Sequence, residues 1–114
     1  MENRFRVKFK LWLEDPSGEP LISWSKYLLL KEVEKTGSIK RAAQKLGIPY
    51  KKAHIYLKLL EERTGSKLLL RQRGKGTFLT EEGKKLLSLY GEILEDLNRV
   101  AKKWEERLKK GENP

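Results

Sequence analysis

Two short helical patterns joined by a tight turn constrain the fold of this chain most strongly. Residues 38–46 and 49–63 each carry apolar residues at helical spacing, and only residues 46–49, of sequence LGIP, lie between the two stripes. Gly47 suits a tight turn, and Pro49 fits the first turn of the second helix, where its missing N–H is no loss. A connection this short fixes the angle between the helices, so we expect them to cross as a rigid pair.

The first helix is predicted to support the second, and the second is predicted to be exposed for binding. Ser38 has the chemistry of an N-cap for the first helix. Ala42 and Ala43 are small enough to let another helix come close. The second helix is predicted to bury Ala53, Leu57 and Leu60 and to leave Lys51, Lys52, His54, Ile55 and Lys58 on its other faces.

The region before the pair is predicted to hold strands and one helix. Residues 4–13 alternate between apolar and polar side chains, which is the period of a strand with one buried face. A turn at 15–18 leads to a short second strand at 21–22. A helix is then expected from about residue 23 to Gly37, where a left-handed cap costs little.

A basic β-hairpin is predicted directly after the pair. Residues 68–70 and 77–79 have the composition of short strands, and residues 71–76, RQRGKG, form a tight loop between them. Thr80 and the acidic residues that follow it mark the start of the last helix, because anionic side chains favour the positive end of a helix dipole.

The last helix has an apolar stripe longer than one small domain needs. Its apolar residues recur at alternating steps of four and three, which predicts a helix of up to about 28 residues with a coiled-coil-like seam. A second copy of the chain, with help from the N-terminal strand, is expected to cover this seam; the alternative is that the helix folds back on its own domain. The predicted dimerisation residues are Leu86, Tyr90, Ile93, Leu97, Val100 and Trp104.

The positive charge is concentrated in the middle of the chain. Residues 37–77 hold eleven Lys or Arg against two Asp or Glu, so this segment carries +9 of the net +10. A localised basic field of this kind is typical of a protein that binds a polyanion, although a Lys-rich solvated surface is the alternative explanation.

Several classes of protein are disfavoured by what the sequence lacks. It contains no cysteine, which excludes disulfides and thiolate metal sites and favours an intracellular, cytoplasmic protein. It has no signal-peptide pattern and no apolar run of membrane-spanning length. No nucleophile lies beside a plausible base, no glycine motif for phosphate opens a helix, and His54 has no second histidine to join it. An enzyme, a cofactor and a metal site are therefore not expected.

The helix pair by itself would also fit an ordinary helical hairpin in a core, but together with the basic hairpin it favours a winged helix-turn-helix. In that arrangement the second helix enters the major groove of DNA and the hairpin, or wing, reaches the backbone or the minor groove. Base-edge contacts are predicted for residues facing away from the buried stripe, and phosphate contacts for cations around them. The predicted DNA-binding residues are Ser38, Lys40, Arg41, Lys45, Tyr50, Lys51, Lys52, His54, Ile55, Lys58, Arg71, Arg73 and Lys75.

Three of these residues have competing interpretations. Tyr50 is as well suited to packing under the turn as to touching DNA. The alternative for His54 is a polar surface residue that neither contacts DNA nor binds a metal. Ile55 would contact a thymine methyl group or be an exposed apolar residue.

The chain resembles a known family of regulators over nearly its whole length. The run from Gly37 to Ala53, GSIKRAAQKLGIPYKKA, and the run from Gly74 to Tyr90, GKGTFLTEEGKKLLSLY, are similar to the N-terminal DNA-binding domain of molybdate-responsive, ModE-type regulators. LysR-type regulators are a more distant match. The resemblance implies a DNA-binding winged helix. The family's molybdate-binding domains would follow the long helix, and no molybdate site is evident here.

The sequence therefore predicts a mostly α fold with a small β component. Residues 1–83 are assigned to a winged helix-turn-helix domain with an N-terminal strand, and residues 84–114 to a long C-terminal helix with a short tail. The predicted function is that of a homodimeric, sequence-specific double-stranded DNA-binding protein that regulates transcription. A protein-interaction scaffold, and an architectural or RNA-binding module using the same basic surface, are the alternatives.

Overall fold

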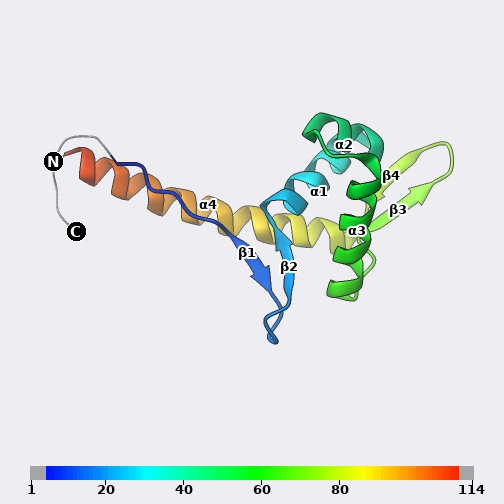
Figure 1. The fold of residues 1–114 in the computed structure, drawn as a ribbon, viewed down its shortest axis with the longest axis horizontal. Coiled ribbons are helices and arrows are strands. Elements are labelled where there is room, and N and C mark those ends of the chain that lie inside the picture. The colour runs from blue at the N-terminus through cyan, green and yellow to red at the C-terminus, as the bar shows by residue number, and fades with distance from the viewer. Residues whose placement is uncertain (1–4, 111–114) are drawn as a thin grey trace.

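Four helices and two separate β-hairpins make up the part of the chain that the structure describes, residues 5–110. The structure is a computed structural model, and Figure 1 shows a head of three helices and a wing from which a long helix projects. This confirms the predicted fold class. The elements are β1 (Trp12–Glu14), β2 (Pro20–Ser23), α1 (Trp24–Thr36), α2 (Ile39–Leu46), α3 (Tyr50–Thr64), β3 (Leu69–Gln72), β4 (Gly76–Leu79) and α4 (Glu81–Lys109).

The helix ends follow the capping residues of the sequence. Ser38 Oγ accepts a hydrogen bond from the backbone N–H of Arg41 at 3.1 Å, and Thr80 Oγ1 accepts one from the N–H of Gly83 at 3.0 Å. Both predicted N-caps are confirmed, and each satisfies a donor that the first helical turn leaves free. The prediction for Pro49 is wrong by one position, because its extended ψ of 136° makes it the residue before α3.

The core lies where α1, α2, α3 and the base of the wing meet. Ala42 and Ala43 of α2 are 0% and 1% exposed, which shows that the small side chains are used for close helix packing. Each fully buried leucine contributes roughly 1.5 to 3 kcal/mol relative to an exposed one. The residues predicted to be buried on α3 are confirmed, and the core also contains Leu29, Leu30 and Val33 of α1 and Leu68, Leu69 and Leu79 of the hairpin.

Tyr90 joins the long helix to the core of its own protomer. Its ring stacks on Tyr27 of α1 with centroids 4.6 Å apart, and its hydroxyl donates to the carbonyl oxygen of Leu11 at 2.7 Å. Burial raises the pKa of the Tyr90 hydroxyl, and the neighbouring Tyr27 adds to the rise, so the group stays a donor at neutral pH. The assignment of Tyr90 to the dimerisation stripe is therefore corrected, because the side chain is 0% exposed within one chain.

Replacing Tyr90 with Phe is expected to destabilise the fold by about 1 kcal/mol, because the substitution removes a hydrogen bond and leaves a carbonyl without its partner. Urea unfolding of Tyr90→Phe measures the change. Tyr56→Phe is the matched control, since the Tyr56 hydroxyl makes no hydrogen bond with another described residue. Equal stabilities of the two variants would contradict a structural role for the Tyr90 hydroxyl.

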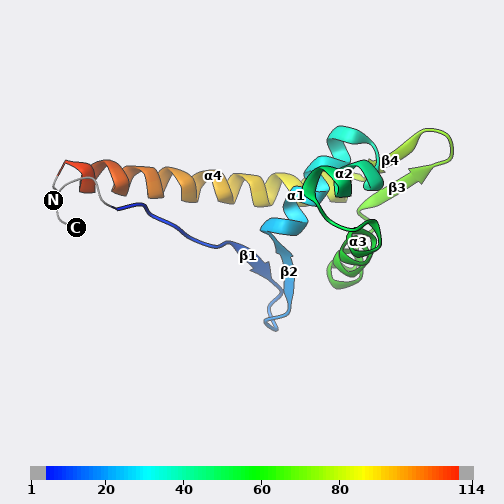
Figure 2. The same ribbon diagram turned by 45° about the horizontal axis from the view of Figure 1, so that its top comes forward.

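The N-terminal segment is less regular than its alternation predicts. Only Trp12–Glu14 pairs with β2, while residues 5–11 lie extended beside α4, as Figures 1 and 2 show. Residue 4 of the predicted strand lies outside the described residues. The neighbour of this segment is a helix, whose backbone groups are already bonded internally, so no ladder can form. Two hydrogen bonds attach the segment to α4, one from the N–H of Val7 to the Glu105 carboxylate at 2.8 Å and one from the Tyr90 hydroxyl to the Leu11 carbonyl oxygen at 2.7 Å.

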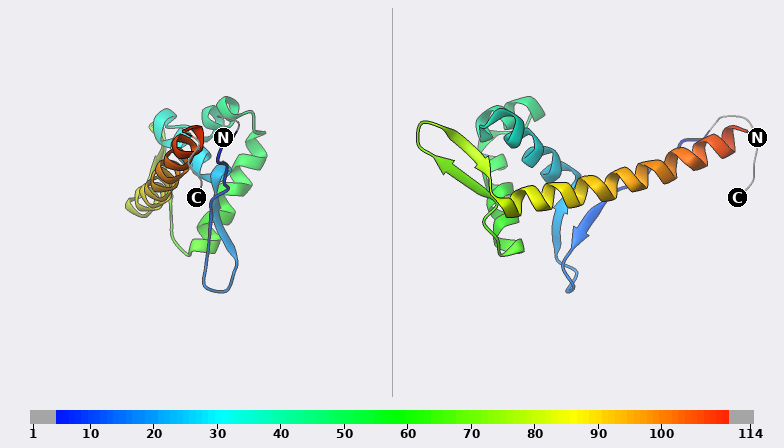
Figure 3. Two further views of the ribbon diagram at one scale, coloured as in Figure 1. Left: turned by 90° about the vertical axis from the view of Figure 1, so that its left-hand side faces the viewer. Right: turned by 180° about the vertical axis from the view of Figure 1, so that it is seen from behind.

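The outer half of α4 stands away from the head of the molecule. Figure 3 shows this half accompanied only by the N-terminal segment. The radius of gyration is 17.4 Å, against about 13 Å for a compact domain of this length. Within residues 5–110, every helix is too short or too polar to cross a membrane.

Candidate nucleic-acid interface

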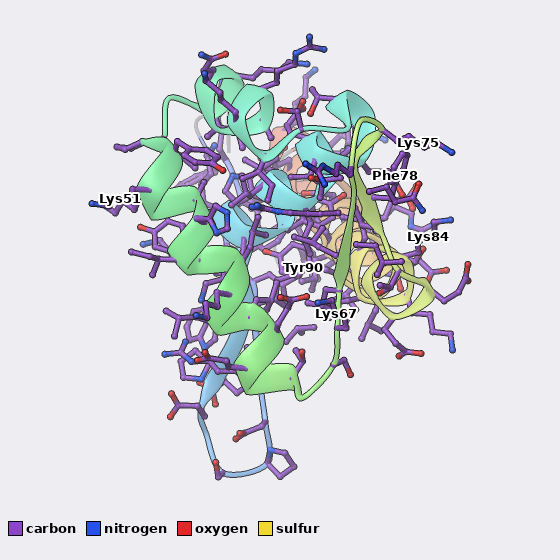
Figure 4. The ribbon with its side chains drawn as sticks, turned by 90° about the vertical axis from the view of Figure 1, so that its right-hand side faces the viewer. Lys51, Lys67, Lys75, Phe78, Lys84 and Tyr90 are labelled. Carbon is purple, nitrogen blue, oxygen red and sulfur yellow. The ribbon has the colours of Figure 1, made fainter. Side chains whose placement is uncertain are left out.

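Helix α3 and the wing form one end of the molecule, opposite the C-terminal end of α4. Figure 4 looks at this end, with Lys51 projecting from α3 and Lys75 from the wing, while Tyr90 lies behind them in the interior. The turn between α2 and α3 is closed by the N–H of Ile48, which donates to the carbonyl of Ala43 at 2.9 Å. This turn holds α3 against α2 with one face buried and the opposite face free.

The free face of α3 carries the side chains that the sequence predicts. Tyr50 is 46% exposed and Ile55 is 55% exposed, which excludes packing of Tyr50 under the turn within this protomer. His54 is half-buried, and its ring meets the ring of Tyr50 edge-on with centroids 5.4 Å apart. The lysines of this face, Lys51, Lys52 and Lys58, are exposed.

The wing is fixed to the helix pair by a close backbone contact. The N–H of Thr77 in β4 donates to the carbonyl oxygen of Gly37, in the turn before α2, at 2.9 Å. Gly76 has a φ of +99°, and a Cβ atom placed there would lie 2.5 Å from the same Gly37 oxygen. Glycine is required at position 76 both for its backbone conformation and for this approach.

We expect Gly76→Ala to destabilise the protein by at least about 1 kcal/mol more than Gly74→Ala, because only the first substitution adds a clash with backbone. Gly74 also has a positive φ, of +76°, but a Cβ atom there meets nothing within 4 Å. Chemical unfolding of the two variants makes the comparison. A Gly76→Ala protein as stable as Gly74→Ala would show that the contact with Gly37 does not hold the wing.

Most cations around α3 are not neutralised by the protein. Among the described residues, Lys45 is the exception on α2, with its Nζ 3.2 Å from Oε2 of the nearly buried Glu32 on α1. This ion pair gives Lys45 a structural role beside its predicted phosphate contact. The cations that make no ion pair with another described residue are Lys40, Arg41, Lys51, Lys52, Lys58, Arg71, Arg73 and Lys75.

Arg71 contacts a side chain of α3, whereas the sequence places it only with the other cations of the wing. Its guanidinium Nη2 contacts Nε2 of His54 on α3, seventeen positions earlier in the chain. The structure therefore brings together a residue predicted to contact phosphate and one predicted to contact bases. No sequence pattern signals this contact, because it depends on where the wing packs.

Two further features of the described residues lie outside this surface. No group of three or more His, Cys, Asp or Glu suited to holding a metal occurs within residues 5–110. A groove of about 800 Å³ lies away from α3, between the N-terminal segment, the start of α1 and α4, and its lining includes Trp12 and Trp24. Its walls are mainly apolar and contain no paired acid and base.

Two crossed helices, a turn of three residues and a basic hairpin beside the second helix define a winged helix-turn-helix domain. The family profile described as bacterial regulatory helix-turn-helix protein, lysR family, matches residues 24–84. The chain belongs to this family. Its match excludes the N-terminal hairpin and most of α4, which lie on either side of the matched residues.

Solved structures of this class share the fold. The crystal structure of BenM_DBD with benA site 1 DNA has a TM-score of 0.64 and 21% identity, covering 75% of this chain and 98% of that one. The CbnR_DBD–DNA complex has a TM-score of 0.65 and 23% identity, covering 76% and 99%. CbnR, a LysR family transcriptional regulator, has a TM-score of 0.61 and 24% identity over 72% of this chain and 28% of its own. Comparison with curated proteins gives no match.

Proposed function

We propose that this protein is a sequence-specific double-stranded DNA-binding regulator of transcription that acts as a homodimer. The observation that carries the proposal is the free face of α3, which lies beside a wing whose cations have no carboxylate partner among the described residues. Helix α3 would enter the major groove, and the wing would lie over the flanking backbone or minor groove. The solved BenM and CbnR domains that share this fold are complexes with DNA.

The side chains divide into two roles in this proposal. Tyr50, His54 and Ile55 would contact base edges, since they lie on the exposed face of α3. Positively charged residues around them would bind phosphate without reading sequence. Ser38 caps α2 and would place the start of that helix against the DNA backbone. The proposed phosphate-binding residues are Lys40, Arg41, Lys45, Lys51, Lys52, Lys58, Arg73 and Lys75.

The outer face of α4 is the proposed dimer interface. Leu89, which is not among the residues predicted for the seam, is 49% exposed and takes the place of Tyr90 on this face. Val100 is 53% exposed on the same side of the helix. A symmetric partner would bury this face and so account for a helix that projects from its own domain. The proposed interface residues are Leu86, Leu89, Ile93, Leu97, Val100 and Trp104.

The charges beside this face favour an antiparallel pair of α4 helices. Glu92 and Asp96 precede the point between residues 97 and 98, and Arg99 and Lys103 follow it at matching distances; in the single protomer Arg99 pairs with Asp96 of the same helix. All four side chains are exposed. Two antiparallel helices centred on this point place each acidic residue opposite a basic residue of the partner, whereas parallel helices place like charges together.

The finer likeness to ModE-type regulators is also part of this proposal. It is supported by the strand and turn before α1 and by the GKGTFLTEEGKKLLSLY run, which spans the wing and the start of α4. We place the protein in the cytoplasm, where bacterial DNA is found. No cofactor is needed for the proposed binding.

Selection of bound sequences from a pool of random duplex DNA tests the proposed function. A symmetric enriched motif is the expected result, because a two-fold dimer presents two identical α3 helices. Uniform binding to all duplexes would favour an architectural role, and preference for RNA over the duplex pool would favour the RNA-binding alternative. Absence of binding at low salt would leave the protein-interaction scaffold as the explanation.

A further inference from the structure

We propose that Arg71 determines base preference by positioning His54, and that it is not one of the phosphate contacts. The inference rests on the proposed function, since it assigns a role within the same DNA-binding surface. Arg71 and Arg73 lie two residues apart at the start of the wing, and charge alone gives them the same role. Their surroundings differ, because only Arg71 contacts the side chain of a residue on α3.

The contact with Arg71 selects one tautomer of the neutral His54 ring. The Arg71 guanidinium has only donors and remains protonated in proteins, so Nε2 of His54 must accept the hydrogen bond. The ring proton of the neutral histidine is then on Nδ1. His54 can therefore offer a ring donor to DNA and no second ring acceptor.

Arg71 is held in place by the backbone that anchors the wing. In the hairpin it lies directly opposite Thr77, whose N–H donates to the Gly37 carbonyl at 2.9 Å. Gly76, the residue before Thr77, lies so close to the same carbonyl that an added Cβ atom would be 2.5 Å from its oxygen. The rung of the hairpin that carries Arg71 is thus the rung attached to the helix pair, while Arg73 lies beyond it toward the loop.

The ring of His54 is held by Tyr50 as well. The two rings meet edge-on at an interplanar angle of 85°. Tyr50 and Arg71 both line a groove of about 380 Å³ between the start of α2, the start of α3 and the wing. With Tyr50 and Arg71 both in contact with it, the His54 ring has a set orientation and presents Nδ1–H to base acceptors, which in the major groove are guanine N7 and O6, adenine N7 and thymine O4.

Removal of Arg71 should therefore act through His54. Without the guanidinium, the ring can rotate and exchange tautomers, so it no longer distinguishes an acceptor from a donor at its base position. We expect Arg71→Ala to reduce discrimination about tenfold at the base positions that His54→Ala also affects. Arg73→Ala removes the same charge from the same wing and should weaken binding to every sequence by a similar factor.

The test measures affinities of four variants for the selected DNA site and for its single base-pair substitutions. The variants are Arg71→Ala, His54→Ala, the double variant and Arg73→Ala as the control. The proposal predicts that Arg71→Ala and His54→Ala lose discrimination at the same positions, and that the double variant loses no more than His54→Ala alone. It is overturned if Arg71→Ala behaves like Arg73→Ala, or if the losses of the single variants multiply in the double variant.

A measurement without DNA checks the contact itself. His54 is the only histidine in the chain, so the nitrogen signals of its ring can be assigned without ambiguity by NMR. At neutral pH the proton is expected on Nδ1 in the wild type and in Arg73→Ala, and to redistribute between the ring nitrogens in Arg71→Ala. The same tautomer distribution in all three proteins would overturn the proposal. Absence of DNA binding by the wild type would instead refute the proposed function.

Discussion

Binding of the wild-type protein to duplex DNA is expected to weaken about a thousandfold as monovalent salt rises from roughly 50 to 200 mM. Each phosphate neutralised by Lys or Arg releases condensed counterions, and about six phosphates contacted per dimer give a slope near about −5 for log affinity against log salt. The physical basis is the local excess of charge, since residues 37–77 carry +9. Fluorescence anisotropy of a labelled duplex across a salt series measures the slope.

Two alanine variants localise this electrostatic effect. Lys75→Ala removes a wing cation without an ion pair to another described residue, and two copies of the change in a dimer should make the slope shallower by up to about 2. Lys102→Ala removes an exposed cation on the far half of α4 and should leave the slope unchanged. An affinity independent of salt, or equal slopes for the two variants, would contradict the assignment of phosphate contacts to the wing.

The substitution Val100→Asp is expected to dissociate the dimer at micromolar concentration and to lower DNA affinity by about a hundredfold or more. Val100 is 53% exposed in the protomer, so the fold of the head should not change. In the proposed dimer the substitution would place two carboxylates in a buried apolar seam, where unpaired charge is costly. Affinity then falls because two half-sites are no longer bound as a unit, although every base contact remains available.

A control on the opposite face of α4 separates this effect from added charge. Ser88 is exposed, and Ser88→Asp adds the same negative charge away from the proposed seam. Analytical ultracentrifugation should show a dimer for Ser88→Asp and for the wild type, and a monomer for Val100→Asp. A monomeric wild type, or a Val100→Asp protein that stays dimeric, would remove α4 from the proposed interface.

Local chemistry made much of the fold predictable. Gly37, Ser38 and Thr80 mark helix ends by their own backbone or side-chain preferences, so the helix boundaries could be placed within one or two residues. The buried stripe of α3 follows from spacing alone. These features involve residues that are neighbours in sequence, and this is why they could be inferred without the tertiary structure.

Features that depend on packing between distant segments could not be placed. The apolar period of α4 does not show which side faces its own domain. Tyr90 was therefore predicted on the outer face, although it is buried, and the exposed Leu89 was not included. The alternation of residues 4–13 predicts a strand. Most of this segment lies beside α4, and a helix has no free backbone groups with which a strand could pair. The contact of Arg71 with His54 requires the wing to pack at one position on the helix pair, which neither residue type signals.

Methylation interference on the selected duplex tests the central claim most directly, because it shows which groove the protein contacts at each position of the DNA site. The claim is that two α3 helices occupy successive major grooves of one site. We expect interference from methylated guanine N7, a major-groove atom, in two clusters related by the site's symmetry and separated by about one helical turn, roughly 34 Å, or a multiple of it. Interference confined to the minor groove, or a single asymmetric cluster, would contradict the account.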